Sequence, residues 1–197
     1  MVELVRPIAV AIDTKSGFGL EFADTYEKSF GDLHGVYRDE RAFVGLLKND
    51  AGKTAYRVFS TSDEAQTGEL IVGTSVVQPG KVANEFNMTR GHIHRIQERA
   101  EMYYCLAGHG VMLLESLDGE VEAIEMRETQ MVYVPGGWIH RSVNVGQETL
   151  ITLFCYPSDA GQDYSIIERS FGMSKLVVDD GEGSWKLLDN PDYLPRR

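Results

Sequence analysis

From about residue 55 onward, short β-type runs alternate with turn signals, and this rhythm constrains the fold more than any other feature of the chain. The turn signals include Pro79-Gly80, Asp118-Gly119 and Asn144-Val145-Gly146. Glycine favours turns because of its backbone freedom, proline because its φ is fixed at a turn value, and asparagine and aspartate because of their local hydrogen bonds. Many short strands at regular spacing indicate an antiparallel sandwich or barrel. The predicted strands are residues 55–60, 69–77, 100–107, 110–116, 121–126, 131–134, 140–144 and 150–156.

The remaining segments predict one helix and two further strands. Residues 39–47 begin with acidic side chains and carry Phe43, Leu46 and Leu47 at helical spacing, so we expect a short helix. Residues 175–179 and 184–188 have strand-like patterns that suit pairing with the N-terminal segment. We therefore expect an all-β fold with a few short helices. In it, an N-terminal arm (1–54) packs on a barrel with C-terminal strands (55–197) as one structural domain.

Composition and charge exclude several classes of protein. The 197 residues are 43% hydrophobic and 25% charged, which is ordinary for a globular protein. The formal net charge of −11 argues against nucleic-acid binding, because a basic face is needed to neutralise phosphates. The apolar run at residues 8–12 is too short for a signal peptide or a membrane span. We expect a cytoplasmic protein with no membrane partner.

Three histidines and one glutamate form a candidate metal site. His92 and His94 project to the same face if the segment is extended, since residues i and i+2 of a strand share a face. Glu101 opens the next predicted strand, and the Pro135-Gly136-Gly137 turn delivers His140. Three imidazoles and one carboxylate disfavour Mg²⁺ and Ca²⁺ and leave Fe²⁺, Mn²⁺, Zn²⁺, Ni²⁺ and Co²⁺ open. His34 and His109 have no other candidate ligands at a motif spacing in the sequence and are not assigned to the site.

At these residues the chain resembles the cupin superfamily. The first cupin motif pairs His-x-His with a glutamate and, six residues later, a glycine, which Glu101 and Gly108 match. The second motif is matched by Pro135, Gly137, His140 and Asn144. The chain departs from the pattern with Phe86 and Thr129 in place of glycines, and its spacer between His94 and Glu101 is longer than usual.

More narrowly, the chain is similar to the cupin-type glucose-6-phosphate isomerases of archaea and some bacteria. The similarity runs from roughly residue 35 to 192. It is carried by Pro79-Gly80-Lys81-Val82, Met88-Thr89-Arg90-Gly91-His92, Arg99-Ala100-Glu101, Val132-Tyr133-Val134-Pro135, Tyr156-Pro157, Asp159-Ala160-Gly161 and Asp189-Asn190-Pro191.

This resemblance implies a function for the site. The expected reaction interconverts glucose 6-phosphate and fructose 6-phosphate through a metal-stabilised cis-enediol(ate), with one divalent transition metal per subunit. Fe²⁺ is the expected ion, and a homodimer is the expected assembly.

The resemblance also assigns roles to individual residues. Glu101 and Tyr156 are the expected catalytic residues. Whether Glu101 acts as base, as ligand or as both stays open, and a hydride shift without a base is the competing mechanism. The expected substrate contacts are Ser75, Thr89, Arg90, Gly91, Tyr103, Tyr156, Gln162 and Tyr164.

Two of these positions depart from the family pattern. Two other functions are alternatives to the isomerase. Arg90 stands where the family usually has lysine, and Gln162 stands where it has a histidine near the substrate. Glutamine can form hydrogen bonds but cannot titrate. The competing functions are an Fe²⁺ cupin dioxygenase and a non-catalytic cupin that binds a sugar phosphate.

Overall fold

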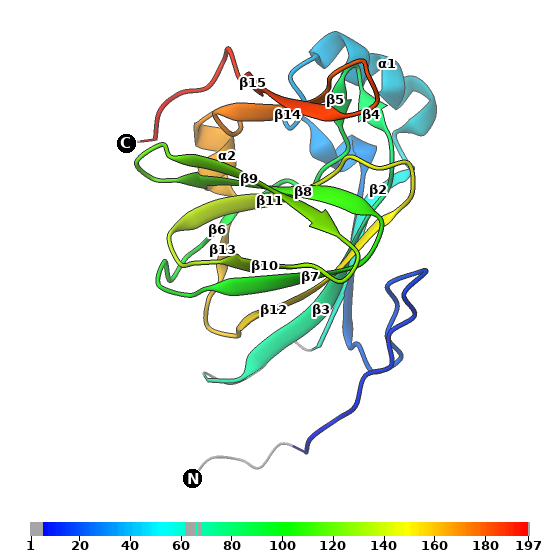
Figure 1. Ribbon diagram of the computed structural model, residues 1–197, viewed down its shortest axis with the longest axis vertical. Coiled ribbons are helices and arrows are strands. Elements are labelled where there is room, and N and C mark those ends of the chain that lie inside the picture. The colour runs from blue at the N-terminus through cyan, green and yellow to red at the C-terminus, as the bar shows by residue number, and fades with distance from the viewer. Residues whose placement is uncertain (1–5, 62–65, 67, 197) are drawn as a thin grey trace.

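Six antiparallel strands form the largest sheet of the computed structural model, which describes residues 6–61, 66 and 68–196. The strand order is β1-β2-β3-β12-β7-β10, so strands distant in sequence lie side by side. Figure 1 shows this sheet curving around the lower part of the molecule. The strands are β1 (Asp24–Ser29), β2 (Thr54–Ser60), β3 (Leu70–Val77), β12 (Leu150–Pro157), β7 (Glu101–Ala107) and β10 (Met131–Val134).

Three smaller sheets complete the β structure. The first has the order β11-β8-β9 and lies across the interior from β7, β10 and β12 (Figure 1). The second pairs β13 with β6, and the third has the order β15-β14-β5-β4. The bounds are β4 (Lys81–Val82), β5 (Glu85–Phe86), β6 (Ile93–His94), β8 (His109–Ser116), β9 (Val121–Arg127), β11 (Trp138–Asn144), β13 (Gln162–Asp163), β14 (Lys175–Asp179) and β15 (Trp185–Asp189).

The side chains of β7 alternate between the interior and the outer face of the sheet. Glu101, Tyr103 and Cys105 are buried, whereas Met102 and Tyr104 are partly exposed. This period of two is the geometry of a pleated strand. It aims Glu101 into the barrel, where the other predicted ligands lie.

Helices occupy the edges of the molecule. The helix α1 (Glu40–Asp50) begins at Asp39, whose side chain accepts a hydrogen bond from the Ala42 amide at 2.8 Å, and it buries Phe43 in the core. A 3₁₀ turn, η1 (Phe30–Leu33), precedes it, and α2 (Ser165–Arg169) follows β13. No helix in the described residues is long and apolar enough to span a membrane.

The structure confirms the all-β prediction and corrects one pairing. The predicted strands from residue 55 onward agree with the observed ones to within two residues, and the predicted helix begins one residue later and continues to Asp50. Within the described residues, the C-terminal strands do not pair with the N-terminal segment. Instead, β14 pairs with β15, and its Val178 pairs with Glu85 of β5. The division into an arm (1–54) and a barrel (55–197) stays a prediction, and residues 1–5 of that arm lie outside the described residues.

Candidate functional site

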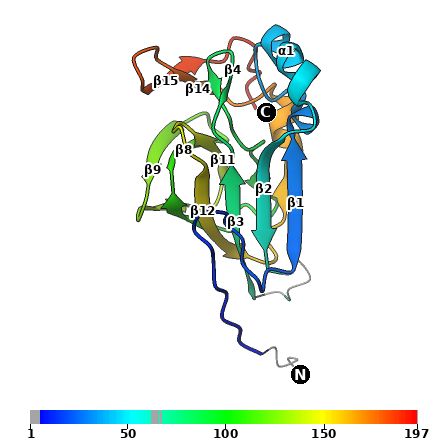
Figure 2. The ribbon, with the colours of Figure 1, turned by 90° about the vertical axis from the view of Figure 1, so that its right-hand side faces the viewer.

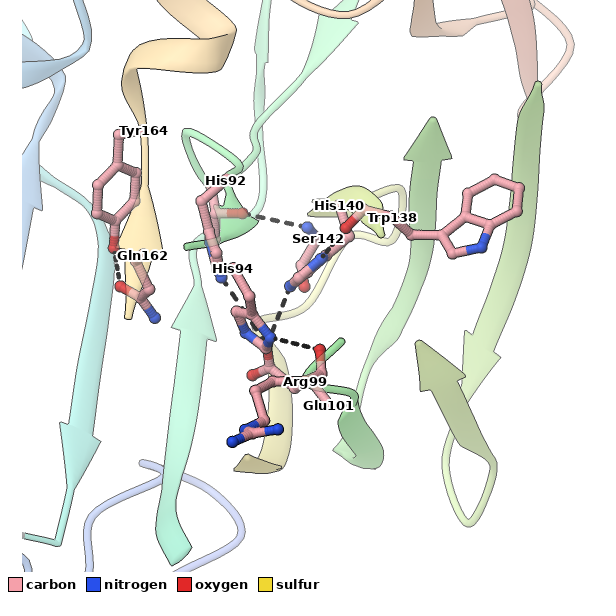
Figure 3. Close-up of polar contacts among 10 residues, drawn as sticks. His92, His94, Arg99, Glu101, Trp138, His140, Ser142, Gln162 and Tyr164 are labelled. Atoms are coloured by element: carbon pink, nitrogen blue, oxygen red, sulfur yellow. Dashed lines mark hydrogen bonds and ion pairs between the residues drawn. The ribbon is translucent and has the colours of Figure 1, made fainter. Parts of the chain in front are cut away.

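The four predicted ligands come from three strands and the residue before one of them. His94 lies in β6, Glu101 begins β7 and His140 lies in β11. His92 precedes β6 and is locked to His140 by two backbone hydrogen bonds. The His92 amide donates to the His140 carbonyl at 3.1 Å, and the His140 amide donates to the His92 carbonyl at 3.0 Å (Figure 3). The backbone therefore fixes two of the ligands relative to each other.

The side chains of these four residues converge on a small buried volume. Their ligand atoms all lie within 4.8 Å of one another. The Oε2 atom of Glu101 lies 3.0 Å from Nε2 of His140, 3.2 Å from Nε2 of His94 and 3.8 Å from Nε2 of His92. All four residues are buried, so the sequence motif corresponds to one compact cluster in the barrel.

Backbone carbonyls set the orientation of two of the imidazole rings. His94 Nδ1–H donates to the Arg99 carbonyl at 2.8 Å, and His140 Nδ1–H donates to the Trp138 carbonyl at 3.1 Å. A ring held in this way presents the lone pair of Nε2 to the centre of the cluster, as metal-binding histidines do. The buried Nε2 of His92 has no hydrogen-bond partner among the described residues. An ion at the centre would satisfy it, so the cluster suits one metal ion.

The electrostatics of the cluster favour the metal-binding forms of Glu101 and His92. Burial alone raises the pKa of a carboxyl group, but hydrogen bonds from His140 and His94 outweigh that effect and hold the pKa of Glu101 well below its usual range. Burial, followed by the charge of His140, lowers the pKa of His92 well below its ordinary value. Glu101 is thus a carboxylate and His92 a neutral imidazole, which are the forms that bind a metal. For His94, burial lowers the pKa, but the hydrogen bond with Glu101 outweighs it and raises the pKa above its ordinary value.

The long spacer between His94 and Glu101 is held from two sides. The Arg99 guanidinium forms two hydrogen bonds with the Asp159 carboxylate, at 2.8 and 2.7 Å. On the other side, Gly136 lies so close that a β-carbon there would be 2.4 Å from the Gln97 carbonyl oxygen. The additional residues of the spacer therefore form a loop that is fixed to its surroundings.

A cavity adjoins the cluster and contains most of the predicted substrate contacts. Its volume is about 80 Å³, and it is partly open to solvent. Its predicted lining residues are Ser75, Thr89, Tyr103, Tyr156, Gln162 and Tyr164, together with the ligands His92 and Glu101. The sequence reasoning missed Tyr26, Tyr56, Val58, Ser60, Ser142 and Phe154, which also line it.

Arg90 and Gly91 do not line this cavity. The Arg90 guanidinium forms an ion pair with Glu168 of α2 at 2.9 Å and donates to the Asp32 carbonyl at 2.7 Å. The Arg90 carbonyl accepts a hydrogen bond from Arg141 at 2.5 Å. Gly91 has a φ of +84°, where glycine is favoured. In this structure the Arg90 side chain ties its loop to η1 and α2.

Two predicted contacts are linked at one wall of the cavity. The Tyr164 hydroxyl donates to the Oε1 atom of Gln162, as Figure 3 shows. Gln162 is also the residue of β13 that pairs with His94 of β6. The Tyr156 ring lies 5.7 Å from the His94 ring and stacks on Phe154. Position 162 thus lies directly beside a ligand-bearing strand.

A strand period of two would have found several of the missed residues. Tyr56, Val58 and Ser60 alternate along β2 and all line the cavity. Ser142 follows His140 by two positions in β11, and its amide donates to the Thr89 hydroxyl at 3.1 Å. Tyr26 carries no comparable signal, since it lies alone among polar residues.

The family model described as Glucose-6-phosphate isomerase matches residues 27–194 of the chain. The chain belongs to this family. A family member named glucose-6-phosphate isomerase from Sinorhizobium medicae (strain WSM419) is 45% identical over 100% of this chain and 92% of its own length. Another with the same name, from Thermococcus gammatolerans, is 42% identical over 98% of this chain and 99% of its own length.

A solved oxalate oxidase structure also resembles part of the fold. Its TM-score is 0.46 and its identity 17%, over 55% of this chain and 54% of the other. A match of this extent is too weak to support an argument about function.

Proposed function

We propose that this protein interconverts glucose 6-phosphate and fructose 6-phosphate, with one divalent transition metal bound by His92, His94, Glu101 and His140. The observation that carries the proposal is the position of this cluster in the wall of a hydroxyl-rich cavity. The family membership supports the same activity.

Glu101 is suited to move the proton between C1 and C2 of the open-chain sugar. Among the described residues that line the cavity, it is the only carboxylate. Its lowered pKa keeps it ionised at neutral pH, so it can accept a proton. A divalent ion bound beside it would supply polarisation of the carbonyl group and stabilise the cis-enediol(ate). Tyr156, close to His94, would act with Glu101.

Neutral donors would hold the phosphate group. The described lining residues include neither lysine nor arginine. The Ser75 hydroxyl is buried without a hydrogen-bond partner among the described residues, and Thr89 lies in the same cavity. Hydroxyl groups that lack a partner gain most from a bound anion, because an unsatisfied buried polar group is costly. Tyr103, Gln162 and Tyr164 complete the binding wall.

Three further properties belong to this proposal. Fe²⁺ is the ion that we expect in the cluster, since iron suits a set of imidazole and carboxylate donors with open positions. The protein would act in the cytoplasm, and it would form a homodimer. Arg90 and Gly91 would contribute to phosphate binding through the loop that they form with Thr89.

A coupled isomerase assay tests the proposal. Chelator-stripped protein is reloaded with Fe²⁺, Mn²⁺, Zn²⁺, Ni²⁺ or Co²⁺, one ion at a time, and incubated with fructose 6-phosphate. We expect glucose 6-phosphate from at least one loaded form and none from the stripped protein. Glu101→Gln should lower kcat by about 10²- to 10⁴-fold, whereas Glu122→Gln, at an exposed position, should leave it unchanged.

The same assay separates the alternatives. No turnover with any ion would contradict the proposed activity. Oxygen uptake by the Fe²⁺ form with an organic substrate would favour a dioxygenase. Binding of a sugar phosphate without turnover would favour a non-catalytic protein.

A further inference from the structure

Tyr26 lies at the free edge of the six-stranded sheet and at the rim of the cavity. It belongs to β1, which is the first strand in the sheet order and pairs with β2 on one side (Figure 2). Its register partner in β2 is Val58, and both residues line the cavity. The edge strand therefore contributes one wall of the site.

The ring of Tyr26 extends from solvent into this cavity. The residue is 43% exposed, yet its inner end lies among other tyrosines. Its ring meets the Tyr56 ring edge-on, with centroids 6.4 Å apart and planes at 82°. Burial, followed by the neighbouring Tyr164, raises the pKa of Tyr26 well above its usual value. A side chain that is exposed at one end and enclosed at the other marks the mouth of the cavity.

Tyr164 lines the same cavity and is a neighbour of Tyr26. It directly precedes α2, and its ring lies 5.5 Å from the His92 ring. Its hydroxyl donates to Gln162 of β13, which pairs with the strand that carries His94. Tyr26, Tyr164 and Gln162 thus form a row from the edge of the large sheet to the small sheet beside the metal ligands.

We propose that Tyr26 is a specificity-determining residue whose ring closes the mouth of the cavity and limits the size of the sugar phosphate that it accepts. The inference rests on the proposed function, because it concerns the substrate of the same site. It adds a residue of the edge strand that lies outside the cluster and its motifs. An aromatic ring can do this because it is rigid and bulky.

Two substitutions separate the ring from its hydroxyl group. Tyr26→Ala removes the ring and opens the mouth, whereas Tyr26→Phe keeps the ring and removes only the hydroxyl group, which neighbours Tyr164. Tyr133→Ala is a matched control, since Tyr133 is 60% exposed on β10 and does not line the cavity. All variants are studied as the full metal-loaded chain, with thermal unfolding as a check on folding.

The measurement compares a six-carbon with a seven-carbon ketose phosphate. We expect Tyr26→Ala to raise kcat/KM for the seven-carbon sugar, relative to the six-carbon sugar, by about tenfold or more, which is the scale of discrimination that a pocket achieves for a small group. Tyr26→Phe should keep the wild-type ratio within about twofold and raise KM for the six-carbon sugar. Tyr133→Ala should match the wild type in both respects.

A binding measurement keeps this inference separate from the isomerase proposal. Calorimetric titration with six-carbon and seven-carbon polyol phosphates, which cannot isomerise, should show the same change in relative affinity for Tyr26→Ala. Selective binding without turnover would sustain the inference about Tyr26 while contradicting the isomerase. An unchanged size ratio in Tyr26→Ala, or no binding of either polyol phosphate to the wild type, would overturn it.

Discussion

At the scale of single residues, Glu85 is a buried carboxyl group outside the cavity. It is 2% exposed in β5. Its Oε1 atom accepts a hydrogen bond from the Arg38 amide at 2.6 Å, whereas Oε2 has no partner among the described residues. Burial raises the pKa of Glu85 above its usual value, and the hydrogen bond from the Arg38 amide offsets this in part. The folded protein therefore favours the protonated form more than the unfolded chain does.

This shift predicts how Glu85→Gln changes stability with pH. The stability that a raised pKa contributes is present below the unfolded value of about 4.3 and is lost as the pH rises through the folded value. Glutamine has no such loss. The free energy of unfolding of Glu85→Gln should therefore improve relative to the wild type between pH 4 and pH 7, as measured by urea denaturation. If the free energies of unfolding of Glu85→Gln and the wild type change in parallel with pH, as we expect for the exposed Glu122→Gln, the prediction is contradicted.

The limits of sequence reasoning are plain at Arg90. Spacing within motifs placed His92, His94, Glu101 and His140 in one cluster, because a turn and a strand period fix their directions. Motif spacing does not fix the direction of a long side chain. Arg90 follows Thr89 in the motif, but its guanidinium pairs with Glu168, which is 78 positions away in the chain. Local sequence contains no information about such a partner.

At the scale of elements, strand β11 binds the loop that precedes β6 through backbone hydrogen bonds. Besides the paired amides of His92 and His140, the Thr89 amide donates to the Ser142 carbonyl at 3.0 Å. A β-carbon on Gly91 would lie 3.1 Å from the Arg141 side chain and from the His140 carbonyl. The loop therefore approaches β11 as closely as a glycine permits.

Gly91→Ala should therefore disturb the proposed metal site as well as the fold. An alanine at φ +84° is strained by about 1–3 kcal/mol, and its methyl group would push the loop away from β11. We expect loss of bound metal and of isomerase activity. Gly119→Ala is the control, because it has a φ of +90° but open space around the added β-carbon. It should lose stability and keep its metal. Equal metal contents in the two variants, measured by atomic emission, would contradict the prediction.

The predictability of an element followed its length. The predicted bounds of β7 and β8 lie within two residues of the observed ones, because β7 alternates buried and partly exposed positions and β8 is a continuous apolar run after the Gly108 turn. The two-residue strands β6 and β13 are too short to produce a period. The partner of β14 was also beyond the sequence pattern, because β5 is chosen by tertiary packing and not by neighbourhood in the chain.

At the scale of the whole molecule, the C-terminal tail is anchored to the barrel by Glu115. This residue of β8 is completely buried. It accepts hydrogen bonds from the Tyr193 hydroxyl at 2.6 Å and the Ser174 amide at 2.7 Å, and it forms an ion pair with Arg196. The last described residues therefore supply the counter-charge for a carboxylate inside the fold.

Arg196→Met should lower the free energy of unfolding by about 3–5 kcal/mol, because it leaves a buried carboxylate without its ion-pair partner. Arg127→Met serves as the control. It breaks an ion pair with Glu125 in which both side chains are largely exposed, and it should cost about 0–1 kcal/mol. Chemical denaturation of both variants measures the difference, and similar losses would show that the tail does not depend on this contact.

The fixed spacer between His94 and Glu101 has a consequence for metal capture. In the language of coordination chemistry, His94 and Glu101 are two donors of one chelating segment. The loop between them is preorganised, because Arg99 binds Asp159 with its side chain and His94 with its carbonyl. The conformational entropy of ordering this loop is lost when the protein folds and not when an ion binds. Affinity for an ion in the proposed site would thereby be linked to Arg99 and Asp159, neither of which is among the four proposed ligands.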